Sequence, residues 1–253
     1  MPATPAGVAV PPRSMRNLRR SVTLLRAFRF EQTDPDRFYD LLAADARAII
    51  SGHMVLQGAC VVDVGGGAGY FMKAFRTAGA DCFAVEPDFS ELSWRGAVPE
   101  GAVLGDGYRL PFRAGTADLV LSSNVLEHVA RPFEMIDELT RVVRPGGLVW
   151  ISFTNWYGPW GGHEMSPWHY LGAERAERRY ERHYGRSTKH HVGTNLYRIH
   201  VGPTLQYVRR HPLLEVVEAG PRYHPRFARG IVHLPGVREV LTWNLELLLR
   251  RRR

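Results

Sequence analysis

A glycine-rich stretch in the first third of the chain has the composition of a ligand-binding turn. It reads VVDVGGGAGYF, from Val61 to Phe71, and its apolar start is typical of a buried strand. Glycine has no Cβ, so backbone N–H groups at such a turn can approach a ligand closely, and a helix that begins there favours negative charge. The spacing is G-x-G-x-G rather than the dinucleotide pattern G-x-G-x-x-G, so the turn alone does not identify its ligand.

Two acidic residues further along match the polar groups of a nucleoside. Glu86 ends the apolar run CFAVE, where its carboxylate can accept hydrogen bonds from two ribose hydroxyls. Asp106 lies in GDGYRLPF, which follows another short apolar run. Because the dinucleotide fold also places an acid at the position of Glu86, this residue indicates a ribose without specifying the cofactor.

Two histidines are candidates for a general base. His128 lies in LEHV after an apolar run, and His163 lies in GGHEM at the start of an aromatic segment. An imidazole can take a proton near neutral pH, as a hydroxyl acceptor requires. A structural or positioning role is the alternative for His128.

We expect no metal site. Several side chains with suitable donor atoms lie near these histidines: Glu127, His128, His163, Glu164 and His169. The zinc motif H-E-x-x-H places two imidazoles on one helical face, whereas His163 and His169 are six residues apart with Pro167 between them.

The elements that must position these residues alternate between short apolar runs and helical stretches. Buried strands are predicted at 60–64, 82–86, 102–104, 118–123, 148–153, 213–219 and 243–250. Helices are predicted at 34–50, 69–78, 88–95, 131–143 and 202–210. This repeated βαβ order predicts an α/β fold with a doubly wound, mostly parallel, seven-stranded Rossmann-like sheet.

Three segments depart from this alternation of strands and helices. Residues 1–33 form a basic N-terminal arm or helix, and residues 34–253 form the main domain with an inserted cap at about 154–201 and a basic aromatic excursion at about 220–242. The aromatic residues of the cap either line an acceptor pocket or form the cap's own core. The charged stretch 173–186 predicts a solvated helix with a Glu174–Arg178 pair.

Composition bounds the class of protein. The chain has 253 residues, 45% of them hydrophobic, and no apolar run as long as a membrane span, so we expect one sizeable globular domain in the cytoplasm. Cys60 and Cys82 are expected to be reduced thiols. The net charge of +8 comes from arginines near both ends, which favours an anionic partner, either nucleic acid or an acidic membrane face, or a plain solvated surface.

Four motifs in order resemble those of the class I S-adenosylmethionine-dependent methyltransferases of the type 11 group. They are the D-x-G-x-G-x-G loop at 63–69, the acid at 86, the D-x-x-x-L-P-F loop from 106 and the R-x-x-x-P-G-G turn from 141. The resemblance implies that S-adenosylmethionine is the cofactor, and that its methionine end lies in a cradle formed by Asp63, Gly65, Gly67 and Gly69. It also implies that Glu86 holds the ribose, that Asp106 and Gly107 flank the adenine, and that Asn124 lies beneath the sulfonium.

The cap resembles a narrower actinobacterial group associated with cell-envelope glycolipid metabolism. The shared stretches are GPWGGHEM, HYLG and PRYHPR, at 158–165, 169–172 and 221–226. The motifs of this group do not establish its acceptor. The reaction we expect is O-methylation of a small molecule or cell-envelope glycolipid, with His128 or His163 as the base that takes the hydroxyl proton. Arg222, Arg226 and Arg229, which alternate with aromatic residues, are expected either to contact anionic lipid headgroups at the inner face of the membrane or to form plain surface.

Two other functions remain as alternatives. An RNA methyltransferase would suit the basic charge, but enzymes that methylate exocyclic amino groups of bases usually carry N/D-P-P-Y/F where this chain has SSNVLEH. Nucleic acid is therefore not the expected partner. A non-catalytic protein that binds the cofactor is the other alternative, because methyl transfer depends mainly on alignment and no single side chain is indispensable. The sequence specifies no oligomeric state.

Overall fold

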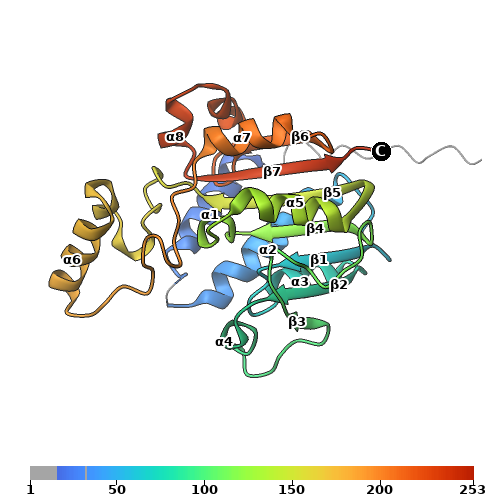
Figure 1. Cartoon of the computed structure of the whole chain (residues 1–253), viewed down its shortest axis with the longest axis horizontal. Coiled ribbons are helices and arrows are strands. Elements are labelled where there is room, and N and C mark those ends of the chain that lie inside the picture. Colours follow the sequence, from blue (N-terminus) through green and yellow to red (C-terminus); the bar gives the residue numbers. More distant parts are fainter. Residues whose placement is uncertain (1–15, 32) are drawn as a thin grey trace, which may run out of the picture.

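A seven-stranded sheet forms the centre of the computed structural model, which describes residues 16–31 and 33–253 (Figure 1). The strand order is β3-β2-β1-β4-β5-β7-β6. The strands are β1 (Cys60–Val64), β2 (Asp81–Glu86), β3 (Ala102–Leu104), β4 (Ala117–Ser123), β5 (Val143–Thr154), β6 (Leu214–Pro221) and β7 (Asn244–Arg251). Strands β1 to β5 pair in parallel and β7 is antiparallel to both neighbours, which confirms the predicted mostly parallel sheet.

Helices cover both faces of the sheet. They are α1 (Leu18–Phe28), α2 (Pro35–Ser51), α3 (Tyr70–Thr77), α4 (Phe89–Leu92), α5 (Pro132–Val142), α6 (Ala173–Tyr184), α7 (Val201–Arg210) and α8 (Val237–Leu241). Side chains alternate along a strand, so Val61 packs with α1, α2 and α3 on one face while Val62 packs with α5 and α7 on the other. Both faces of the central strands are therefore covered by apolar side chains, as the continuous hydrophobic runs predict.

The helix α2 begins where the sequence predicts. Asp34 accepts a hydrogen bond from the backbone N–H of Arg37, and Pro35 occupies the first turn, where its missing N–H costs nothing. Phe38 and Leu42 on the inner face are completely buried.

The helix α1 lies within the predicted N-terminal arm or helix and packs against the main domain. Leu24 is buried in the same core as α2, and the guanidinium of Arg20 makes two hydrogen bonds of 2.5 Å with the carboxylate of Asp45. Arg16 forms an ion pair with Glu246 of β7. The rest of the predicted arm, residues 1–15, lies outside the described residues.

The cap is a compact insertion between β5 and α7. It contains two 3-10 turns, η3 (His163–Met165) and η4 (Trp168–Leu171), followed by α6, which stands off from the sheet near the start of β7 (Figure 1). Since β5 ends beside the start of β7, the cap lies at the carboxyl ends of the parallel strands. It has a small core of its own, made of Trp156, Met165, Ala176, Tyr180 and Leu196.

The basic excursion differs from the expected surface patch. It folds into η5 (Arg226–His233) and α8, but Arg222 is fully buried and donates to the hydroxyls of Ser123 and Ser152. Arg229 forms an ion pair with Glu218 at 3.1 Å and is mostly buried. Of the three arginines that were expected to face lipid, Arg226 alone is exposed. No helix within residues 16–31 and 33–253 has the length and apolar character needed to cross a bilayer.

Candidate functional site

The glycine loop connects β1 to α3 at the carboxyl edge of the sheet. β1 lies between β2 and β4, so the loop occupies the point at which the strand order reverses, where open α/β sheets bind ligands. Gly65, Gly67 and Gly69 have φ values of 75°, 46° and 79°. A Cβ on Gly65 would lie 2.2 Å from a methyl of Val125, whereas a Cβ on Gly67 would meet nothing within 4 Å. Gly67 thus faces open space that a cofactor can occupy.

Asp63 supplies an unpaired carboxylate oxygen at the base of this loop. Its side chain is 1% exposed, and its Oδ2 atom has no hydrogen-bond partner in the described part of the chain. Burial, with a smaller contribution from Glu86, raises the pKa of Asp63 to about 8, against a lowering by the backbone N–H of Met72. An uncompensated buried carboxyl is the arrangement that a cationic ligand such as the ammonium of S-adenosylmethionine would stabilise.

Glu86 joins the end of β2 to the glycine loop. Its carboxylate accepts from the backbone N–H of Gly67 at 3.1 Å and from that of Asp88 at 3.3 Å. Burial raises the pKa of Glu86, and these two hydrogen bonds oppose the rise. A carboxylate has about four acceptor positions, so two remain for ribose hydroxyls.

Asp106 and Gly107 form a turn after β3. Asp106 is exposed and accepts from the backbone N–H of Tyr108 at 2.9 Å. A Cβ on Gly107 would approach the methyl of Met135 to 3.2 Å, so this glycine packs against α5. The turn is compatible with an adenine edge beside Asp106, and the role of both residues stays a prediction.

Asn124 follows β4 with a backbone φ of 57°, a left-handed conformation that asparagine tolerates better than most residues. Its Oδ1 accepts from the side chain of Asn244 at 2.8 Å, and its N–H donates to the backbone carbonyl of Ser152 at 2.8 Å. The sequence did not indicate Asn244, because it lies on β7, 120 residues away.

His128 and His163, far apart in the sequence, stack at this edge with ring centroids 4.9 Å apart. The ring of His190, from the segment between α6 and α7, lies 5.2 Å from that of His128 and 4.5 Å from that of His163. Nδ1 of His128 is 2.8 Å from the backbone carbonyl of Asn195, and Nδ1 of His190 is 2.6 Å from the carboxylate of Glu164. The two candidate bases therefore belong to a cluster of three imidazoles.

The surroundings of the cluster lower the pKa values of two side chains, those of His163 and Glu164. Burial lowers the pKa of His163 to about 3, with help from His190 and His128. Burial raises the pKa of Glu164, but the hydrogen bonds from His190 outweigh this effect and bring the pKa to about 2. A neutral imidazole and an ionised carboxylate thus stand side by side.

Sequence reasoning missed His190. The only signal is the pair His190–His191 in a segment without helical or strand periodicity. Two other side chains considered as metal donors are not among the three whose ring nitrogens converge: Glu127 accepts from the backbone N–H of Thr154, and His169 packs against Trp156.

The cap aromatics separate into two groups. Trp156 belongs to the cap's own core. Trp160 instead packs against Phe28 of α1 at 4.7 Å and against Trp243 at 5.1 Å between ring centroids. The half-buried group Phe28, Trp160 and Trp243 is an aromatic surface contributed by three segments, and no sequence pattern connects them.

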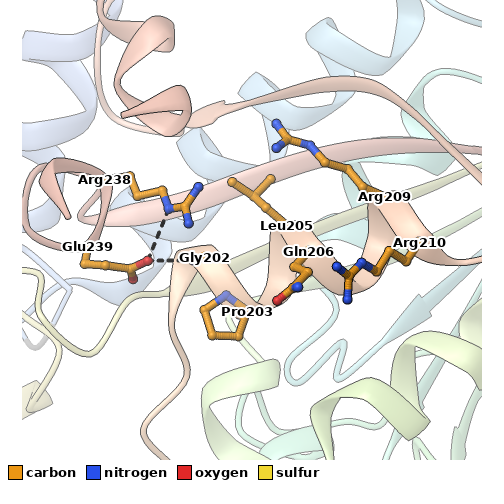
Figure 2. A pocket seen from close by; sticks show the side chains of 8 residues that line it. All are labelled: Gly202, Pro203, Leu205, Gln206, Arg209, Arg210, Arg238 and Glu239. Carbon is orange, nitrogen blue, oxygen red and sulfur yellow. Dashed lines mark hydrogen bonds and ion pairs between the residues drawn. The ribbon is translucent and has the colours of Figure 1, made fainter. Parts of the chain in front are cut away.

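A separate hollow lies at the junction of α7 and α8 (Figure 2). It is lined by Gly202, Pro203, Leu205, Gln206, Arg209, Arg210, Arg238 and Glu239. The carboxylate of Glu239 accepts from the backbone N–H groups of Val201 and Gly202 and so caps the start of α7. None of the residues assigned to the cofactor lines this hollow.

Comparison with known proteins agrees with the geometry of the glycine loop. Residues 62–151 match the methyltransferase domain family. An uncharacterized methyltransferase of Mycolicibacterium gilvum is 46% identical over 92% of this chain and 94% of its own length. One from Mycobacterium tuberculosis is 43% identical over 92% of this chain and 94% of its own length.

Solved structures share the fold at low sequence identity. An S-adenosylmethionine-dependent methyltransferase from Mesorhizobium loti has a TM-score of 0.56 and 20% identity, and the match covers 84% of this chain and 98% of that one. The relatives and the matched domain indicate a methyltransferase. The open glycine loop and the unpaired oxygen of Asp63 are consistent with this family. The chain belongs to the class I methyltransferase family and is an S-adenosylmethionine-dependent methyltransferase.

Proposed function

We propose that the protein transfers the methyl group of S-adenosylmethionine to an oxygen atom of a small-molecule or cell-envelope glycolipid acceptor. The observation that carries this proposal is the cluster of His128, His163 and His190 at the carboxyl edge of the sheet. A hydroxyl must lose its proton to attack the methyl carbon, and an imidazole that carries a lone pair can accept a proton or bind a cation that favours proton loss. An acceptor that needed no proton removal would have no use for this group.

Alignment supplies the rest of the catalysis. Methyl transfer is an in-line displacement, so the acceptor oxygen, the methyl carbon and the sulfur must be collinear in a pocket that excludes water. Asn124, fixed by Asn244, and the aromatic surface of Phe28, Trp160 and Trp243 are suited to position the acceptor. Aromatic faces pack well against sugar and acyl surfaces.

A lipid acceptor is supported by an exposed surface of η5 and α8. Five of its apolar side chains are between 42% and 84% exposed: Phe227, Leu234, Val237, Val240 and Leu241. Exposed arginines lie in η5 and at the neighbouring end of α7: Arg209, Arg210 and Arg226 (Figure 2 shows the first two). We call this the η5–α8 surface. Exposed apolar residues beside cations are suited to anionic lipid headgroups and the acyl chains beneath them.

Labelled-methyl transfer tests the acceptor class. The protein would be incubated with methyl-labelled cofactor and with lipid, polar-metabolite and RNA fractions, and the labelled product identified by mass spectrometry. We expect a methoxy group in the lipid or polar fraction and no transfer by the Gly67→Arg variant. Label on nitrogen, or label in RNA alone, would contradict the proposal.

Co-sedimentation with vesicles tests the membrane contact. We expect binding to phosphatidylglycerol vesicles at low salt, weaker binding as salt rises, and loss of binding in a Phe227→Asp, Val240→Asp variant. Val55→Asp, at a site that is 79% exposed elsewhere on the molecule, is the matched control. Wild-type protein that stays in the supernatant at low salt would exclude this surface as a membrane contact.

A further inference from the structure

The histidine cluster has the geometry of a cation site. One ring nitrogen from each of His128, His163 and His190 lies within 4.8 Å of the other two. In a tetrahedral zinc site with Zn–N distances of about 2.0–2.1 Å, the nitrogens lie roughly 3.4 Å apart. Side-chain movements of about an ångström would therefore bring the three nitrogens around one ion.

Hydrogen bonds on the outer side of the cluster determine which nitrogens are available. The carbonyl of Asn195 and the carboxylate of Glu164 can only accept, so His128 and His190 each donate through Nδ1. In the neutral form of each imidazole, the Nε2 atom then carries the lone pair. Metal-bound histidines usually show this pattern, in which the second nitrogen donates to a carbonyl or carboxylate and so fixes the tautomer.

His163 provides an independent indication of a ligand site. Its Nε2 atom is buried and has no hydrogen-bond partner within residues 16–31 and 33–253. Buried polar atoms are nearly always paired, so an unpaired imidazole nitrogen here is suited to bind an ion. His163 also has a φ of 49°, a backbone conformation that is uncommon outside glycine.

We propose that His128, His163 and His190 bind a divalent transition-metal ion, with Zn²⁺ as the best match to three imidazoles, and that its open position takes the acceptor oxygen. The expected absence of a metal rested on local spacing, whereas this site joins residues 35 and 27 positions apart from three segments. All three residues are partly rather than fully buried, so the site is accessible to a fourth ligand. Three histidines and one open position are typical of catalytic rather than structural zinc.

This proposal deepens the proposed function and rests on it for the identity of the fourth ligand. A hydroxyl bound to the ion loses its proton to water more easily, because the cation stabilises the alkoxide. The oxygen then forms a bond to the methyl carbon of S-adenosylmethionine, the S–CH₃ bond breaks, and its electron pair remains on sulfur. The metal is unchanged, and His128 and His163 act as ligands rather than as the base.

Zinc binding by the full chain, purified without a histidine tag and stripped by chelation, tests the site directly. Calorimetry and elemental analysis should give one Zn²⁺ per chain for the wild type and none for His163→Ala or His190→Ala. Glu164→Gln, which keeps the ligands and removes the charge behind His190, should weaken binding about 10- to 100-fold. His233→Ala, at an exposed histidine outside the cluster, should bind as the wild type does.

Cofactor binding and a cobalt probe separate the possible failures. All variants should still bind S-adenosylmethionine, which also reports that they fold. Azide should shift the visible absorption of the Co²⁺-loaded wild type if one position is open. No stoichiometric zinc, or equal zinc affinity in the wild type and the histidine variants, would overturn the metal site, and an azide-insensitive spectrum would overturn the open position. A metal-loaded protein that methylates nitrogen would overturn the proposed function alone.

Discussion

The glycine-loop half of the sheet and the cap differ in how their residues come together. In the first, β1, the loop and α3 are consecutive, and Glu86 reaches Gly67 from only 19 residues away. In the second, Glu164 holds His190 across 26 residues, and His128 bonds to Asn195 across 67. The glycine-loop half is thus built from contacts between nearby segments, whereas the cap is built from contacts between segments far apart in the sequence.

This difference has a functional counterpart. The cofactor is the same throughout the family, so its half can use a strand, a turn and a helix in a fixed order. Apart from His128, three features lie outside the matched domain at 62–151: the aromatic surface, the histidine cluster and the η5–α8 surface. Substrate choice is expected to lie in these additions, since function resides in sites placed on a common fold.

The largest expected effect comes from filling the open space at Gly67. We expect Gly67→Arg to abolish S-adenosylmethionine binding in calorimetry, because a side chain there would occupy the cofactor's place. Gly185→Arg, at the end of α6, is the matched control, since that glycine also has a positive φ, of 65°, and nothing within 4 Å of a Cβ. If both variants bound the cofactor equally well, the assignment of the loop would be wrong.

The same contrast explains how much the sequence could predict. Periodicity and caps placed β1, β3 and the start of α2 at or within a residue of their observed bounds, because each signal acts over a few neighbouring residues. Two motifs pointed to the glycine loop and to Glu86, and the fold brings them together through the hydrogen bond from Gly67 to Glu86. Their roles toward the cofactor stay predictions.

The sequence did not predict the contacts between segments that are far apart along the chain. The sequence PRYHPR suggests a surface cation at Arg222, but the side chain is fully buried and donates to the hydroxyls of Ser123 and Ser152. His190 and Asn244 have no local pattern at all, and only the folded chain brings them to His128 and Asn124.

The pH dependence of stability should distinguish Asp63 from an ordinary carboxylate. Its folded pKa is about 8 and its ordinary value is 3.8, so stability is fully present below about pH 4 and is lost as pH rises toward 8. We expect the cofactor-free wild type to lose up to about 1.4 kcal/mol of unfolding free energy per pH unit in this window, relative to Asp63→Asn. Denaturant titrations at several pH values measure this, and parallel curves for the two proteins would refute the raised pKa.

A smaller effect is expected at Glu86. Its replacement by alanine removes acceptors for the ribose hydroxyls and for the N–H of Gly67, so cofactor binding should weaken by about 1–3 kcal/mol. Calorimetry with Glu100→Ala, an exposed acid before β3, as control would isolate the contribution of the site. Unchanged affinity in Glu86→Ala would place the ribose elsewhere.

The smallest effect is expected on the outer face of α6. Glu174 is 86% exposed and lies 3.5 Å from Arg178, so water screens the pair and its formation costs side-chain entropy. Glu174→Ala should change the unfolding free energy by less than about 0.5 kcal/mol and leave methyl transfer unchanged. Thermal denaturation and labelled-methyl transfer measure both. A loss above about 1 kcal/mol would indicate that this face of the cap packs against a partner. The contrast between a solvated α6 and the buried residues around the glycine loop would then fail.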